Sequence, residues 1–97
     1  IDFIKAETRV KYPMYRKPGS DKFERVSWDF AMDRIARLMK EDRDTNFVET
    51  NSDGVRVNRW PTMALLSGCA TSNETGWLTY KLARGLGIVQ LENQARI

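Results

Sequence analysis

The sequence is short of the residues that most often build metal sites and nucleophilic active sites. Its 97 residues include one cysteine, Cys69, and no histidine. A single thiol excludes a disulfide within the chain, and a zinc site cannot be assembled without three or four cysteine or histidine ligands. Histidine-dependent triads and histidine acid–base chemistry are excluded within these residues as well.

The sequence also lacks long apolar runs and a strong excess of either charge. No apolar run approaches the roughly 20 residues needed to cross a bilayer, so we expect no transmembrane segment. The chain begins Ile1-Asp2-Phe3, with no signal-peptide pattern, and we expect it to be processed or cut from a longer protein. Its 16 basic and 13 acidic residues are interspersed, which predicts a mixed, solvated surface and no nucleic-acid partner.

What the sequence does contain is the pattern of one βαβ unit near its C-terminal end. Two short apolar runs are separated by a loop of small and polar residues and a helical pattern. These segments are 63–66 (first strand), 67–73 (loop), 73–85 (helix) and 88–91 (second strand). We therefore predict an α/β fold with a partial parallel sheet and one βαβ unit over about 63–91. A right-handed crossover places its first loop at the carboxyl ends of the strands, where open α/β sheets bind ligands.

The second helix carries its own start and stop signals. Thr71-x-x-Glu74 matches a capping box, and Gly87 is a fitting C-terminal stop. Five residues fall on one side of this helix and predict its packing side: Trp77, Leu78, Lys81, Leu82 and Gly85.

A β-hairpin and an amphipathic helix are predicted upstream, within residues 10–43. The Pro18-Gly19 turn joins 13–16 to 23–26. The helix runs from the N-cap Ser27 to Asp42. Its apolar residues recur at helical spacing and predict a packing face: Trp28, Ala31, Met32, Ile35, Ala36, Leu38 and Met39.

Residues 44–61 read as an exposed excursion between the helix and the βαβ unit of 62–97. Asp53-Gly54 between β-branched residues predicts a second hairpin. Trp60-Pro61 is predicted to be a joint, because a residue before proline is pushed toward extended geometry. The two parallel strands and two helices do not cover each other fully, so we expect one piece of a larger α/β layer.

The loop of residues 67–73 is the candidate for chemistry. It has no bulky side chain, and backbone N–H groups at the following helix start can face an anion such as a phosphate. It matches neither a Walker loop nor a dinucleotide fingerprint, and a plain βα turn is the alternative. Cys69 reads more simply as a half-buried filler than as a nucleophile, because the chain offers no base to activate it. No acidic spacing matches a calcium loop.

Four segments, in this order, resemble the catalytic subunit of formate dehydrogenases in the molybdopterin oxidoreductase family, most closely the respiratory, exported type. They are R-K-P-G-S-D-K-F-E-R-V-S-W-D (16–29), V-N-R-W (57–60), S-N-E-T-G-W-L (72–78) and N-Q-A-R-I (93–97). The resemblance implies a fragment of the cofactor-binding α/β domain. It also implies molybdenum or tungsten on two molybdopterin guanine dinucleotides in the parent enzyme.

The resemblance implies cofactor-binding roles for five residues: Gly68, Cys69, Asn73, Gln94 and Arg96. It implies no catalytic residue and no metal ligand within this chain. The parent carries a 4Fe–4S cluster that one cysteine cannot hold. The selenocysteine or cysteine that binds the metal, with its following histidine, would come directly after Ile97. We therefore expect a UGA codon there, which intact-mass analysis and the downstream reading frame would test.

The parent would oxidise formate to CO2 and pass electrons to an iron–sulfur subunit, while this fragment alone would be inert. Its expected partners are the remainder of the large subunit and that electron-transfer subunit. The resemblance implies a periplasmic location for an exported parent, and a cytoplasmic one for a fragment expressed without a signal. Two alternatives stay open: a related molybdopterin oxidoreductase with another substrate such as nitrate, and a free-standing interaction module that pairs with itself.

Overall fold

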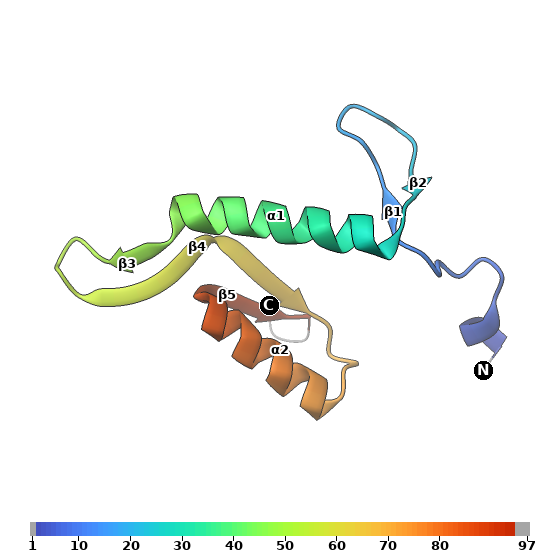
Figure 1. Ribbon diagram of the computed structural model, residues 1–97. Helices are drawn as coiled ribbons and strands as arrows, with labels where there is room; N and C mark the ends of the chain where they lie inside the picture. The colour runs from blue at the N-terminus through green and yellow to red at the C-terminus, as the bar shows by residue number, and fades with distance from the viewer. Residues whose placement is uncertain (1, 95–97) are drawn as a thin grey trace. The chain divides into compact units, whose positions relative to one another are not determined.

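The computed structural model describes residues 2–94, which fall into two compact units that meet between Met39 and Lys40. Figure 1 shows the elements of each unit in chain order. Among the described residues, no helix combines the length and the apolar character that a membrane crossing requires.

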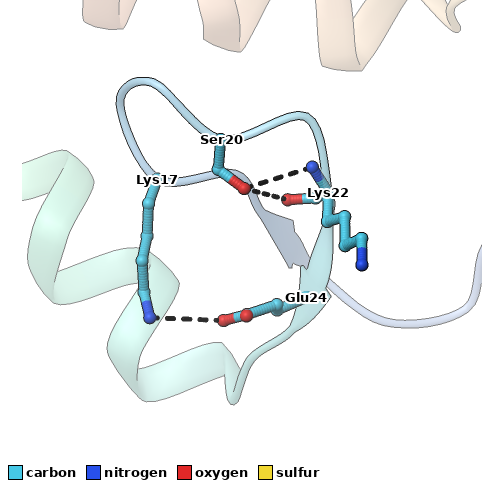
Figure 2. Close-up of polar contacts among 4 residues, drawn as sticks. All are labelled: Lys17, Ser20, Lys22 and Glu24. Atoms are coloured by element: carbon cyan, nitrogen blue, oxygen red, sulfur yellow. Dashed lines mark hydrogen bonds and ion pairs between the residues drawn. The ribbon is translucent and has the colours of Figure 1, made fainter.

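The first unit contains the predicted hairpin. A short 3-10 helix, η1 (Asp2–Lys5), precedes it. The antiparallel strands β1 (Met14–Tyr15) and β2 (Glu24–Arg25) confirm the pairing predicted for this region. Figure 2 shows how the connecting loop is held: Ser20 Oγ accepts a hydrogen bond from the Lys22 N–H at 3.2 Å, and Lys17 pairs with Glu24 at 3.6 Å.

Helix α1 (Trp28–Asn46) confirms the long helix and extends it by four residues. Ser27 caps it as predicted, because its Oγ accepts a hydrogen bond from the Phe30 N–H at 3.1 Å. At the other end the Asn46 side chain donates to the Asp42 carbonyl at 3.0 Å, which supports the added turn. None of its residues is buried, and Trp28 and Met32 are each 61% exposed. The predicted packing face is therefore not covered within the described residues.

The second unit is built on a three-stranded sheet with the order β3-β4-β5. Strand β3 (Val48–Thr50) pairs antiparallel with β4 (Arg56–Ser67), which confirms the hairpin around Asp53-Gly54. Strand β5 (Ile88–Asn93) pairs parallel with β4, and helix α2 (Asn73–Leu86) connects the two. The predicted βαβ unit and the α/β assignment are confirmed.

The joint predicted at Trp60-Pro61 is wrong, because β4 runs through it as one strand of 12 residues. Pairing with β3 reaches Arg59, pairing with β5 begins at Trp60, and the ladder is irregular between Trp60 and Ala64. Pro61 falls in that irregular interval. Proline is tolerated inside a strand where a bulge or an open edge removes the need for its missing N–H.

The ends of α2 follow from local chemistry, with one correction. The N-cap is Ser72, not Thr71, and its side chain accepts a hydrogen bond from the Thr75 N–H at 3.2 Å. The capping box predicted from Thr71 to Glu74 is therefore wrong by one residue. Gly87 ends the helix in the left-handed region at φ 90°, as its place in the sequence predicts.

The packing side of α2 also differs from the prediction. The buried residue of the helix is Ala83, at 4% exposure, whereas Trp77 and Leu82 are 64% and 62% exposed. Small residues let the helix lie close to the strands, and the large apolar residues face away from them. Lys81 lies over the Trp77 ring at 4.7 Å on that outer side.

The buried core is small and gathers at the amino end of β5. Among residues 2–94, the buried hydrophobic residues are Trp60, Ala83 and Ile88, at 1%, 4% and 5% exposure. Gly87 precedes Ile88 and lies close to the chain before Trp60, because an added Cβ would be 2.8 Å from Phe47 Cε2 and 2.9 Å from the Asn58 carbonyl oxygen. Only glycine fits both this space and the positive φ.

Candidate functional site

The candidate site lies at the carboxyl ends of the two parallel strands. Ser67, the last residue of β4, is in register with Asn93 at the end of β5. The next residue, Gln94, donates its backbone N–H to the Ser67 carbonyl at 3.0 Å. The loop after β4 and the residue after β5 therefore leave the sheet side by side, as the βαβ prediction requires.

The loop itself is open and lined by small residues. Residues 68–73 are all exposed, and a Cβ added at Gly68 would meet nothing within 4 Å. Ser72 satisfies the Thr75 N–H, while N–H groups in the first turn of a helix have no carbonyl of their own helix to accept them. The positive end of the helix dipole adds to the attraction for an anion, although Glu74 in the same turn opposes it.

A cleft next to this loop separates α2 from the carboxyl halves of the strands. Its volume is about 450 Å³. Hydroxyl groups dominate the polar part of its wall, from Ser67, Thr71, Thr79 and Tyr80, and Gly76 leaves space where a side chain would intrude. The cleft therefore offers neutral hydrogen-bonding groups, with the Glu92 carboxylate at its strand side.

The structure brings together four of the five predicted site residues at this end of the sheet. Gly68, Cys69 and Asn73 lie in the loop or at the start of α2, and Gln94 follows β5. Arg96 lies outside the described residues. The interpretation of Cys69 as a half-buried filler is wrong, because its free thiol is exposed.

The sequence did not predict a polar cluster that lies at the other end of the β4–β5 ladder, near Trp60. The Trp60 indole N–H donates to the Asp42 carboxylate at 2.7 Å and to Thr62 Oγ1 at 3.0 Å, and Thr62 also donates to Asp42. The hydrogen bonds from Thr62, Trp60 and Asn46 outweigh partial burial and lower the pKa of Asp42 below its usual value. No local pattern joins Asp42 to Trp60, so the sequence gives no signal for this cluster.

The Asp42 cluster has a structural role rather than the properties of a metal centre. Among residues 2–94, no three histidine, cysteine, aspartate or glutamate side chains are placed to hold a metal ion. Arg43, next to Asp42, donates from Nε to the Leu86 carbonyl at 2.9 Å, and its guanidinium lies 4.2 Å from the Phe47 ring centre. These contacts join the end of α1 to the end of α2.

The chain is similar to known proteins over nearly its whole length. The chain is 55% identical to the formate dehydrogenase-O major subunit of Escherichia coli (strain K12) over 97 residues, which are 100% of this chain and 10% of that protein. It is 55% identical to the formate dehydrogenase major subunit of Haemophilus influenzae over 95 residues, 98% of this chain and 9% of that one. The formate dehydrogenase subunit alpha of Megalodesulfovibrio gigas is 41% identical over 91 residues, 94% and 9% of the two chains.

The chain thus spans about one tenth of the length of the curated relatives it matches. A family model described as molybdopterin oxidoreductase matches residues 9–95, which include both hairpins, both long helices and the loop at the carboxyl end of the sheet. The chain belongs to the molybdopterin oxidoreductase family.

Proposed function

We propose that this chain is a segment of a formate dehydrogenase large subunit that lies against the pterin cofactor. In this proposal the parent enzyme oxidises formate to CO2, and the loop of residues 68–73 with Gln94 forms part of the cofactor-binding wall. Two observations together support the proposal. Identity to formate dehydrogenase subunits extends over the whole chain, and the open loop lies where α/β sheets bind ligands.

Family membership implies a molybdopterin cofactor in the parent, and the loop fits such a group in three respects. It is exposed from Gly68 to Asn73, it carries no bulky side chain, and Gly68 has open space where a Cβ would stand. Helix-start amides suit the phosphates of a pterin dinucleotide. Two guanine dinucleotides with molybdenum or tungsten are the form of the cofactor that we propose.

The residues of this chain would bind and orient that cofactor rather than move protons. When bound, the cofactor supplies the two-electron chemistry with formate. The backbone N–H groups at the start of α2 would hold phosphate oxygens, and the Gln94 amide would donate and accept hydrogen bonds at a polar cofactor edge. The metal ligand and the iron–sulfur cysteines would come from other parts of the parent, so the segment alone would be inactive.

The same proposal includes an iron–sulfur electron-transfer subunit as partner and a periplasmic location for an exported parent. A second function, self-association of a free-standing interaction module, is favoured by one observation. Large apolar side chains are exposed on both helices and on the sheet, among them Met32, Leu66 and Trp77 at 61%, 68% and 64%. Size-exclusion chromatography with light scattering on the isolated chain would detect such pairing.

The test of the cofactor proposal is a matched pair of glycine variants in the full-length enzyme. Gly68→Leu fills the loop, whereas Gly85→Leu adds the same side chain on α2, at another glycine with nothing within 4 Å. We expect Gly68→Leu to lower bound pterin and formate oxidation at least about tenfold, which is a loss of 1.4 kcal/mol in binding. Gly85→Leu should leave the pterin content near that of the unmodified enzyme.

Gln94→Ala in the same enzyme tests the second part of the wall. We expect a lower pterin content with an unchanged melting temperature of the protein. Normal pterin content and normal formate oxidation in both Gly68→Leu and Gln94→Ala would contradict the proposal.

A further inference from the structure

One edge of β4 has no strand beside it over more than half of its length. Strand β3 is in register with β4 from Arg56 to Arg59, whereas β4 continues to Ser67. Strand β5 pairs with the other edge from Trp60 onward. Figure 1 shows β3 beside only the first part of the long β4 arrow. Within residues 2–94, no strand is paired with the β3-side edge of 62–67.

The main-chain groups that point to this open edge follow from one hydrogen bond. Gln94 donates its N–H to the Ser67 carbonyl at 3.0 Å, so the Ser67 main chain is directed toward β5. In a strand, the main-chain groups of successive residues point alternately to the two edges. The N–H and carbonyl groups of Leu66 and Ala64 are therefore directed to the open edge, where residues 2–94 provide no strand to pair with them.

The side chains of this part of β4 are those of an interior strand. Residues 63–66 are four consecutive apolar residues, Met-Ala-Leu-Leu, which is typical of a parallel strand covered on both faces. Leu66 is nevertheless 68% exposed in this chain. Natural edge strands are protected by charged side chains, short length or bulges. The irregular interval of β4 ends at Ala64, and residues 64–66 carry no charged side chain.

Strand β5 is more polar than residues 63–66 of β4, and this difference indicates which of the two strands lies at the edge of the complete sheet. It alternates apolar residues with Gln90 and Glu92, and the Glu92 charge protects an outermost strand against unwanted pairing. Both strands have an unpaired edge among the described residues. The composition of the two strands assigns the edge position to β5 and the interior position to β4.

We infer that the open edge of β4, residues 62–67, takes a further β-strand from the same parent polypeptide, outside residues 1–97. The relatives are about ten times longer than this chain, so a covalently linked strand is available at high effective concentration. A second copy of the chain has no such advantage.

The added strand would complete the site at the carboxyl end of the sheet. With strands on both sides, β4 becomes central, and the loop of residues 68–73 lies in a crevice between the ends of its two neighbours. This consequence rests on the proposed cofactor role of the loop. The strand pairing itself does not, since it follows from the edge and from the apolar residues of β4.

Hydrogen exchange in the full-length enzyme tests the pairing directly. The amides of Ala64 and Leu66 are measured at single-residue resolution and compared with that of Ser52, which is exposed in the β3–β4 turn. After correction for intrinsic rates, we expect exchange at Ala64 and Leu66 to be at least about 100-fold slower than at Ser52. Exchange as fast as at Ser52 would overturn the inference. Protection that disappears on dilution would overturn it as well, because it would identify a second copy as the partner.

A pair of charge variants sharpens the result. Leu66→Lys places a cation beside the proposed pairing edge, and Val55→Lys places one in the turn, where Val55 is 56% exposed. We expect Leu66→Lys to speed exchange at Ala64 and to lower the yield of soluble full-length enzyme, with little effect from Val55→Lys. Equal behaviour of the two variants would contradict the inference. An enzyme with protected amides but without pterin or formate oxidation would contradict only the proposed function.

Discussion

The two ends of the β4–β5 ladder differ in how far they are covered. Trp60, at the first end, is 1% exposed, its indole N–H is hydrogen-bonded, and its backbone N–H donates to the Gly87 carbonyl at 2.6 Å. At Leu66, six residues later, the side chain is 68% exposed, and the following loop is exposed throughout. The closed end fixes the positions of β4, β5 and α2 relative to each other.

The difference shows how this unit holds an open site with a very small core. Because the strands are clamped at one end, the loop at the other end needs no packing of its own to keep its place beside Gln94. Residues 68–73 of that loop remain exposed. Three predictions test whether the closed end has this role.

Replacement of Trp60 is expected to have the largest effect. Trp60→Ala removes the largest fully buried side chain and should lower the free energy of opening of β4 and β5 by about 3–5 kcal/mol. Trp60→Phe keeps most of the volume and loses the hydrogen bonds to Asp42 and Thr62, so its effect should be smaller. Native-state hydrogen exchange at the β5 amides of the full-length protein measures both. Similar losses for the two variants would mean that the hydrogen bonds, and not the packing, dominate.

Gly87→Ala comes next. The new Cβ would stand 2.8 Å from Phe47 Cε2 at a φ of 90°, so strain and overpacking together should cost roughly 2–4 kcal/mol. Gly68→Ala at the open end is the control, with nothing within 4 Å of the new Cβ and an expected change within about 0.5 kcal/mol. The same exchange experiment compares them. Equal effects of the two alanines would contradict the contrast between the ends.

The smallest effect is the pH dependence from Asp42. Hydrogen bonds from Thr62 and Trp60 lower the pKa of Asp42 below its ordinary value of 3.8, so they favour the ionised carboxylate in the folded state. Its contribution to stability is complete above pH 3.8 and is lost as the pH falls through the lower pKa of the folded state. Urea unfolding of the unmodified protein and of Asp42→Asn at a series of pH values should give a stability difference that is constant near neutrality and shrinks in acid. A difference that does not change with pH would exclude this role.

The sequence predicted correctly those parts of the fold that are determined by a few neighbouring residues. Ser27 starts α1 with its own hydroxyl, Gly87 ends α2 because it accepts a positive φ, and Asp53-Gly54 turns the β3–β4 hairpin. The errors arose where a neighbouring strand or helix decides. Pro61 would end an isolated strand, but here it falls where the ladder with β5 is irregular. The packing side of α2 is set by how closely Ala83 approaches the sheet, which the apolar pattern of the helix alone does not reveal.

The candidate site divides in the same way. The βαβ pattern predicted that the loop after β4 and the residue after β5 lie together, and the hydrogen bond between Gln94 and Ser67 confirms it. The assignment of Gly68, Cys69, Asn73, Gln94 and Arg96 to a pterin came from family resemblance, and it stays a prediction. The Asp42–Trp60 hydrogen bond joins residues 18 apart in sequence through the fold of the whole unit, so no short motif announces it.

The β3–β4 turn is a suitable place to attach a label. Asn51 Oδ1 accepts the N–H groups of Asp53 and Val55 at 3.0 and 2.9 Å, and the Asn51 backbone N–H donates to the Val55 carbonyl at 2.9 Å. These hydrogen bonds all lie within the turn, so they do not depend on contacts with other parts of the protein. A fluorophore or a short peptide tag attached at Ser52 would report on assembly of the parent enzyme from a position remote from the loop at the other end of β4.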